Sequence, residues 1–309
     1  MSEQVLYAKA SVERKPAYRQ QTLIVRKDGK LLARKIPVGP EAAAHVRRYA
    51  EHYETLRRAL EGSRAVSAAP CALNPDGSVD FPFLEDPTLT EKLAGAGPEA
   101  YGRQLAAFRD ALAGAFGETA FEATDAFREI YGDPGLPEGL TALKVTNADL
   151  NFDNVFCPAE GGYILIDYEW ILPFPVPAAY LFYRALLPDP AYNAFNPAQQ
   201  DTVLGLLGIS REQEDAFRRM EASFLEWVSP EIYRMDYFAR TPGARHNTIH
   251  EFSRLTELPE ENRVLNDNLA LLTYHTRKPW YRACRKAERT LRKISDGFHR
   301  RARRNGAAK

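Results

Sequence analysis

The chain has 309 residues, of which 45% are apolar and 27% are charged. This composition is typical of a folded soluble protein and excludes a disordered chain. No run of 18 apolar residues occurs, so we expect no membrane-spanning helix. The first residues lack the cationic start and apolar stretch of a secretory signal, and three well-separated cysteines fit no zinc spacing. We therefore expect a cytoplasmic protein.

The formal net charge of zero conceals an uneven distribution of charge along the chain. Residues 277–309 hold 13 of the 41 Lys and Arg residues but only two of the 41 acidic residues. Residues 1–276 consequently carry a formal charge of −11. An acidic body with a basic tail indicates an anionic partner or an internal docking surface for the tail.

The first predicted element group is a small α+β lobe over residues 1–86. Two apolar runs flank Asp28-Gly29, which is a strong hairpin signal. Residues 41–60 show helical periodicity, and a second hairpin surrounds the turn at residues 74–77. These patterns predict five strands with one helix after the third.

A helical lobe is predicted next, over residues 87–275. Amphipathic periodicity marks helices up to Phe116 and again over 199–207, 211–228 and 265–274. Two short apolar runs, 141–146 and 163–166, interrupt the helices and enclose a polar loop. A third segment, residues 276–309, reads as a basic amphipathic helix. A β-rich lobe followed by a helical lobe predicts a two-domain plan with a cleft.

The segments that carry chemistry are N-A-D-L-N-F-D-N at 147–154 and I-D-Y-E at 166–169. Phosphoryl transfer needs a carboxylate to accept or orient a hydroxyl proton and hard oxygen ligands for magnesium. Asp149 and Asn154 lie five residues apart on one loop, and Asp167 follows the next apolar run. Asp153-Asn154 alone would also fit an ordinary turn.

These motifs resemble those of the protein-kinase-like superfamily, and within it the choline and aminoglycoside kinase branch. The family's loop reads H-x-D-x-x-x-x-N, with Asn147 here in place of the histidine, and its metal motif often reads D-[FY]-E. The resemblance implies a two-lobed kinase-like fold. It also implies that Asp149 is the catalytic base and that Asn154 and Asp167 bind Mg²⁺.

The same resemblance implies a nucleotide site in the N-terminal lobe. Lys35, on the third predicted strand, would bind the α- and β-phosphates of ATP, with Arg34 as the alternative. Its glutamate partner should come from the following helix. Glu51 fits the family spacing best, Glu54 is also plausible, and Glu41 lies too early.

The connector after the second hairpin resembles the hinge of small-molecule kinases. There the backbone near Phe83, Leu84 and Glu85 would bind adenine. One departure concerns the first turn, residues 11–18, which contains no glycine although protein kinases cover the phosphates with a glycine-rich loop. Ser11, Arg14 or Lys15 could contact phosphate instead.

We therefore predict an ATP- and Mg²⁺-dependent kinase that phosphorylates a hydroxyl group of a small molecule or glycan. Related kinase-like domains occur in bacterial surface-polysaccharide biosynthesis, so lipopolysaccharide or another lipid-linked glycan is one predicted acceptor. Asn147 and the glycine-free turn leave a pseudokinase open, which would bind nucleotide or act as a scaffold without turnover.

The predicted tail helix has a narrow apolar stripe at four- and three-residue spacing from Trp280 to Phe298, with basic residues between. Residues 277–304 could contact an anionic membrane peripherally. They could equally pack on the acidic body or on another chain. Nothing else in the sequence indicates nucleic-acid binding.

Overall fold

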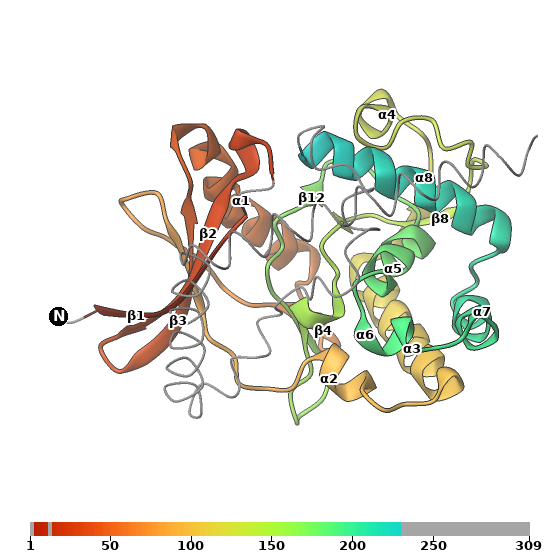
Figure 1. The fold of residues 1–309 in the computed structure, drawn as a ribbon, viewed down its shortest axis with the longest axis horizontal. Helices are drawn as coiled ribbons and strands as arrows, with labels where there is room; N and C mark the ends of the chain where they lie inside the picture. Colours follow the sequence, from red (N-terminus) through yellow and green to blue (C-terminus); the bar gives the residue numbers. More distant parts are fainter. Residues whose placement is uncertain (1–2, 12–13, 230–309) are drawn as a thin grey trace, which may run out of the picture. The chain divides into compact units, whose positions relative to one another are not determined.

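An antiparallel sheet of five strands, in the order β1-β2-β3-β6-β5, forms the N-terminal part of the chain (Figure 1). The computed structural model describes residues 3–11 and 14–229, which belong to one compact unit. The predictions for residues 230–309, including the basic helix, lie outside the described residues. The strands of this sheet are Glu3–Ala10 (β1), Gln20–Lys27 (β2), Lys30–Pro37 (β3), Ala72–Leu73 (β5) and Val79–Pro82 (β6).

The two predicted hairpins are confirmed as β2-β3 and β5-β6, and they meet where β3 pairs with β6. Asp28 and Gly29 join β2 to β3 with φ angles of 50° and 82°, a left-handed backbone that Asp and Gly tolerate better than other residues. The second hairpin places β6 beside β3, with Ala33 opposite Phe81. The predicted helix is α1, Ala43–Ala59, and its buried residues include Val46, Tyr49 and Leu56.

Short 3₁₀ turns and further helices follow in the described part of the chain. The turns are Pro16–Tyr18 (η1), Pro40–Ala42 (η2) and Phe152–Asn154 (η3). The helices are Leu89–Leu93 (α2), Pro98–Phe116 (α3), Asp125–Tyr131 (α4), Ala178–Leu186 (α5), Pro190–Asn193 (α6), Pro197–Leu206 (α7) and Arg211–Val228 (α8). The β-rich N-terminal part followed by a helical part is the predicted α+β fold class. No described helix is long and apolar enough to cross a lipid bilayer.

Three small sheets carry the polar loop between the helices. Their strands are Val66–Ala68 (β4), Glu118–Ala120 (β7), Thr141–Leu143 (β8), Thr146–Asn147 (β9), Val155–Phe156 (β10), Tyr163–Leu165 (β11) and Ile171–Leu172 (β12). The sequence patterns did not predict β4, which pairs in parallel with β11 almost 100 residues later. A three-residue strand has too short a pattern to be found without its partner.

One aromatic-rich core underlies these small sheets. Phe108 of α3 packs against Phe182 of α5 and Tyr163 of β11, with ring centroids 5.7 and 4.6 Å apart.

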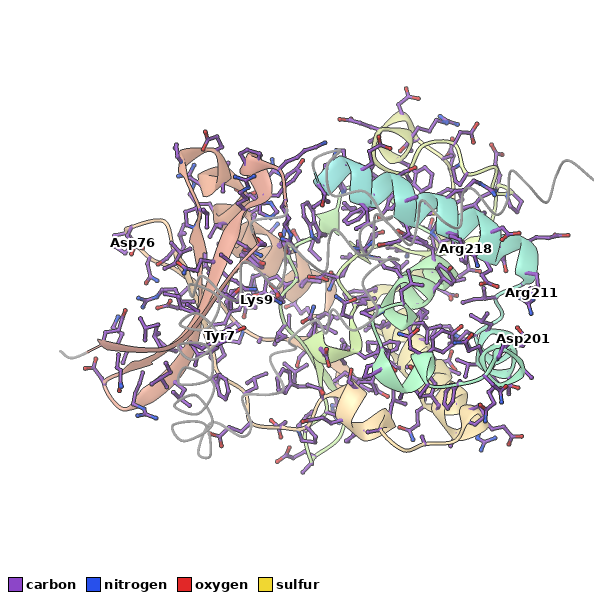
Figure 2. The ribbon with its side chains drawn as sticks, viewed as in Figure 1. Tyr7, Lys9, Asp76, Asp201, Arg211 and Arg218 are labelled. Atoms are coloured by element: carbon purple, nitrogen blue, oxygen red, sulfur yellow. The ribbon has the colours of Figure 1, made fainter. Side chains whose placement is uncertain are left out.

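Helix α8 begins at a capping box, in which Ser210 and Gln213 satisfy each other's backbone amides. At the same end, Arg211 of α8 and Asp201 of α7 lie side by side on the surface, 2.8 Å apart (Figure 2). The helices thus provide a rigid base for the loop at residues 147–154.

Candidate active site

The loop at residues 147–154 is held by its own polar side chains. The Asn147 side-chain oxygen accepts a hydrogen bond from the Asp149 amide at 3.0 Å, which closes an Asx turn. The Asn154 side-chain amide donates to the Asp149 carbonyl at 3.2 Å, and that of Asn151 donates to the Asp149 carboxylate at 3.0 Å. Asn147 is almost fully buried. It therefore fixes the loop backbone at Asp149 from a buried position.

Asp167 lies at a strained turn directly after β11. Its φ is 48°, a conformation that costs free energy for any residue with a Cβ atom. The Glu169 amide donates to the Asp167 carbonyl at 2.8 Å, so the chain reverses within three residues. Tyr168, fully buried between the two acids, donates to the Ala69 carbonyl at 2.8 Å and anchors the turn in the core. Asp167 and Glu169 consequently both face the loop at residues 147–154.

The structure brings Lys35 of β3 to Asp167. The Lys35 ammonium group donates to Asp167 Oδ2 at 2.7 Å, and the Tyr49 hydroxyl donates to Oδ1 at 2.7 Å. Lys35 is only 5% exposed. Arg34, the alternative phosphate-binding residue, instead pairs with Asp80 and Glu3. The structure therefore favours Lys35 over Arg34 as the candidate for binding phosphate.

The structure differs from the sequence analysis on the partner of Lys35. Glu51 is exposed on α1, and the ion pair seen for Lys35 is with Asp167. The α1 side chain that reaches the site is Tyr49, which is 1% exposed and bonded to Asp167. Helical spacing accounts for the difference, because Glu51 lies two residues after Tyr49 and so faces away from the buried side of the helix.

Three carboxylates converge at the junction of these loops. Oxygen atoms of Asp149, Asp167 and Glu169 all lie within 4.8 Å of one another. Hard oxygen donors at this separation are suited to a divalent cation such as Mg²⁺. Asn154, the other predicted ligand, has its amide nitrogen on the Asp149 backbone. Its neighbour Val155 pairs with Leu165, two residues before Asp167.

The carboxylates of the cluster differ in acidity. Burial and the neighbouring charges of Asp167 and Glu169 raise the pKa of Asp149 to about 7. Burial opposes ionisation of Glu169 too, but Arg14 and His45 outweigh it and lower the pKa of Glu169 to about 2. Asp149 is therefore poised to exchange a proton near neutral pH, as a general base must.

Arg14, Glu169 and His45 are site residues that sequence reasoning did not place together. The Arg14 guanidinium forms an ion pair with Glu169 Oε1, and His45 Nε2 lies 2.5 Å from the same oxygen. Glu169 is 3% exposed. The D-Y-E motif was the available signal for Glu169. Contacts that span 155 and 124 residues leave no local pattern.

Arg184 supports the catalytic loop from helix α5. Its Nε donates to the Ala148 carbonyl at 2.9 Å, and its guanidinium pairs with Glu221 of α8. The Tyr180 hydroxyl donates to the same glutamate at 3.0 Å. Arg184 therefore fixes the backbone directly before Asp149, and its charge lies near enough to lower the pKa of that residue.

The predicted adenine hinge lies in the connector between β6 and α2. The Phe83 amide donates to the Leu31 carbonyl at 3.4 Å. In the described part of the chain, the amides of Leu84 and Glu85 have no backbone acceptor. Adenine binding by these two residues stays a prediction.

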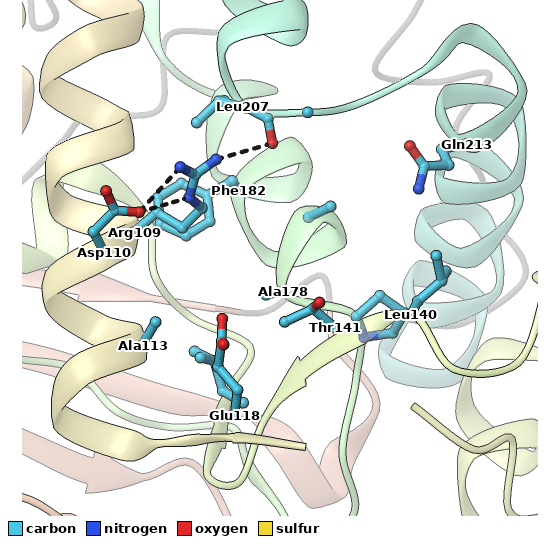
Figure 3. A pocket seen from close by; sticks show the side chains of 14 residues that line it. Arg109, Asp110, Ala113, Glu118, Leu140, Thr141, Ala178, Phe182, Leu207 and Gln213 are labelled. Atoms are coloured by element: carbon cyan, nitrogen blue, oxygen red, sulfur yellow. Dashed lines mark hydrogen bonds and ion pairs between the residues drawn. The ribbon is translucent and has the colours of Figure 1, made fainter. Parts of the chain in front are cut away.

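A separate cavity of about 370 Å³ lies between α3, α5 and the start of α8 (Figure 3). Its lining includes Phe182, Thr141 and Gln213 but none of the carboxylates described above. Arg109, its cation, is bonded to the Asp110 carboxylate and the Leu207 carbonyl. The cavity is therefore distinct from the convergence of Lys35, Asp149 and Asp167.

The β-rich sheet and the helical part that follows it have the arrangement that the protein-kinase-like resemblance implies. The sequence matches no protein-family model and no curated protein. Among solved structures, the chain is similar to the gentamicin complex of APH(2″)-IIa (11% identity, TM-score 0.42, 72% of this chain and 83% of that chain). It is also similar to spectinomycin phosphotransferase APH(9)-Ia with ADP and spectinomycin (11%, 0.41, 83% and 89%). A third is a macrolide 2′-phosphotransferase type I (14%, 0.38, 71% and 84%).

Proposed function

We propose that this chain transfers the γ-phosphoryl group of ATP to a hydroxyl group of a small molecule or glycan. The observation that carries the proposal is the convergence of Lys35, Asp149 and Asp167, which come from three separate segments. Structural ion pairs rarely gather three acids around one another, because like charges at this distance repel.

Each group then has a chemical role in the transfer. Asp149 accepts the proton of the acceptor hydroxyl, whose oxygen forms the new bond to the γ-phosphorus as the bond to the β-phosphate oxygen breaks and ADP leaves. Lys35 turns from Asp167 to the α- and β-phosphates. Asn154 and Asp167 would hold Mg²⁺, which neutralises charge on the phosphates. The backbone amides of Leu84 and Glu85 would bind adenine.

Substitution of Asp167 tests this proposal. We expect Asp167→Asn to abolish Mg²⁺-dependent phosphate release from ATP, because the substitution removes the negative charge with which Asp167 would hold Mg²⁺. Asp201→Asn is the matched control, since Asp201 pairs with exposed Arg211 at the surface, away from the carboxylate cluster. Turnover that is unchanged in Asp167→Asn would refute the assignment.

Nucleotide binding separates the enzyme from the pseudokinase alternative. A thermal-shift titration with ATP and Mg²⁺ should raise the melting temperature of the wild-type chain. Stabilisation together with phosphate release supports the kinase. Stabilisation without release would favour a nucleotide-binding scaffold, and no stabilisation would contradict both nucleotide-dependent functions.

The acceptor that we propose is a class of molecules that carry a hydroxyl group. A lipid-linked surface glycan, as in lipopolysaccharide biosynthesis, would suit a basic tail that contacts an anionic membrane. The segment after the metal motif, residues 173–177, contains three prolines and joins β12 to α5. Prolines stiffen this segment, so we expect a preformed acceptor wall rather than a phosphorylation-switched loop.

A further inference from the structure

Arg14 reaches the carboxylate cluster from the turn between β1 and β2. Its guanidinium pairs with Glu169, which lies 155 positions later in the chain. The Arg14 carbonyl accepts a bond from Arg19 Nε at 2.8 Å, and the next amide, that of Lys15, donates to the Val228 carbonyl at 2.8 Å. Both polar groups of the peptide bond after Arg14 are therefore held, which helps to position the guanidinium.

Aromatic packing fixes the same turn. Tyr18 of η1 has its ring centroid 5.1 Å from Trp227 of α8, 5.2 Å from Trp170 and 5.3 Å from His45. Such contacts contribute beyond the burial of their area. The turn is therefore held against the helical part before any nucleotide is present.

The position of Arg14 matters because residues 11–18 contain no glycine. In a kinase-like fold this turn covers the nucleotide phosphates, and glycines normally let backbone amides approach them. A turn built from side-chain-bearing residues needs another donor. A guanidinium offers a rigid fork of N–H groups that matches phosphate oxygens.

We propose that Arg14 binds the terminal phosphates of the nucleoside triphosphate and takes the place of a glycine-rich loop. This inference rests on the proposed function and adds a phosphate-binding residue to it. Glu169 holds the guanidinium beside Asp149 and Asp167, where the γ-phosphate must lie for transfer.

His45 leaves the buried Glu169 with a partner when Arg14 turns to phosphate. Both Arg14 and His45 contact the same oxygen, Oε1. When Arg14 turns to phosphate, His45 remains at 2.5 Å from the Glu169 carboxylate. A buried charge without any partner would cost several kcal/mol; Glu169 therefore keeps one partner throughout.

Nucleotide affinities of paired variants test the proposal. The Kd values of ATP, ADP and AMP, with Mg²⁺ present, are measured by calorimetry. We expect Arg14→Met to weaken ATP binding by roughly tenfold to a hundredfold, the size of a lost charge-assisted bond. AMP, which lacks the terminal phosphates, should change by less than about twofold. The loss of ATP affinity in Arg14→Lys should lie between that of Arg14→Met and none. Arg26→Met, at an exposed position on β2, is the matched control.

Glu169→Gln distinguishes phosphate binding from a purely structural ion pair. The Glu169→Gln variant removes the carboxylate charge that holds Arg14 but leaves the Arg14 guanidinium. The loss of ATP affinity should therefore be smaller than in Arg14→Met. Equal losses in both variants, or an equal loss for AMP, would overturn the assignment of Arg14. If Arg14→Met does not fold, the double variant Arg14→Met/Glu169→Gln, which strands no buried charge, should show the same ATP-selective loss.

Failure of the inference and failure of the proposed function remain separable. Wild-type protein that binds ATP, with unchanged affinity in Arg14→Met, would refute the role of Arg14 alone. Wild-type protein that binds no nucleotide would refute both.

Discussion

Asp149 is easier to ionise in the unfolded chain than in the folded one. Burial and the charges of Asp167 and Glu169 raise its pKa from 3.8 to about 7 on folding. Between these two pKa values, the folded state holds a proton on Asp149 that the unfolded state has lost. The contribution of Asp149 to the free energy of unfolding is therefore greatest at the acid end and is lost as the pH rises from about 4 to about 7. The residue that is best placed to act as a base is therefore also a source of instability at neutral pH.

Replacement of Asp149 should consequently stabilise the protein in a pH-dependent way. We expect Asp149→Asn to raise the free energy of unfolding at pH 8 by on the order of 1–3 kcal/mol, a gain that shrinks towards pH 4. Urea unfolding in metal-free buffer at several pH values measures it, with Asp201→Asn as the control. A gain of equal size at pH 5 and pH 8, or a loss, would contradict the electrostatic cause.

At the scale of elements, helices α5 and α8 are joined by a buried charge pair that also supports the catalytic loop. The side chains of Arg184 and Glu221 are 14% and 10% exposed. The Arg184 guanidinium also lies 4.0 Å from the centroid of the Phe224 ring. Because Arg184 binds the Ala148 carbonyl as well, the packing of two helices sets the position of the loop.

Removal of one partner of this pair should be costly. Arg184→Met leaves the Glu221 charge buried, so we expect a loss of about 3–5 kcal/mol in the free energy of unfolding. Arg184→Met/Glu221→Gln should recover most of this stability but not ATP turnover, because the bond to Ala148 stays lost. Arg218→Met, at an exposed position on α8, is the control and should change stability by less than about 0.5 kcal/mol. A double variant with full turnover would refute the role of Arg184 in positioning the loop.

At the scale of the whole molecule, charge is segregated between an acidic body and the basic residues 277–309. We propose that the protein is cytoplasmic and that this segment contacts anionic membranes. Flotation with vesicles that contain anionic lipid should recover the full chain and not a chain ending at residue 276, and added salt should weaken recovery. Equal partitioning of the two forms would count against membrane contact, as would equal recovery with neutral vesicles.

Much of the architecture could be predicted because its signals are local. The Asp28-Gly29 turn, the periodicity of α1 and α8, and the loop that carries Asp149 and Asn154 each depend on residues within a few positions of one another. Strand β4 could not be predicted, because its three residues become a strand only through pairing with β11.

The sequence by itself determined the two N-terminal hairpins, helices α1 and α8, and the segments that carry Asp149, Asn154 and Asp167. The tertiary structure alone decided which charges meet. Lys35 pairs with Asp167 rather than with Glu51, and Glu169 binds both Arg14 and His45. The physical reason is that turn chemistry and helical periodicity act over a few residues. The partner of a buried charge, by contrast, is set by how distant segments pack, and folding selects the arrangement that leaves no buried charge unpaired.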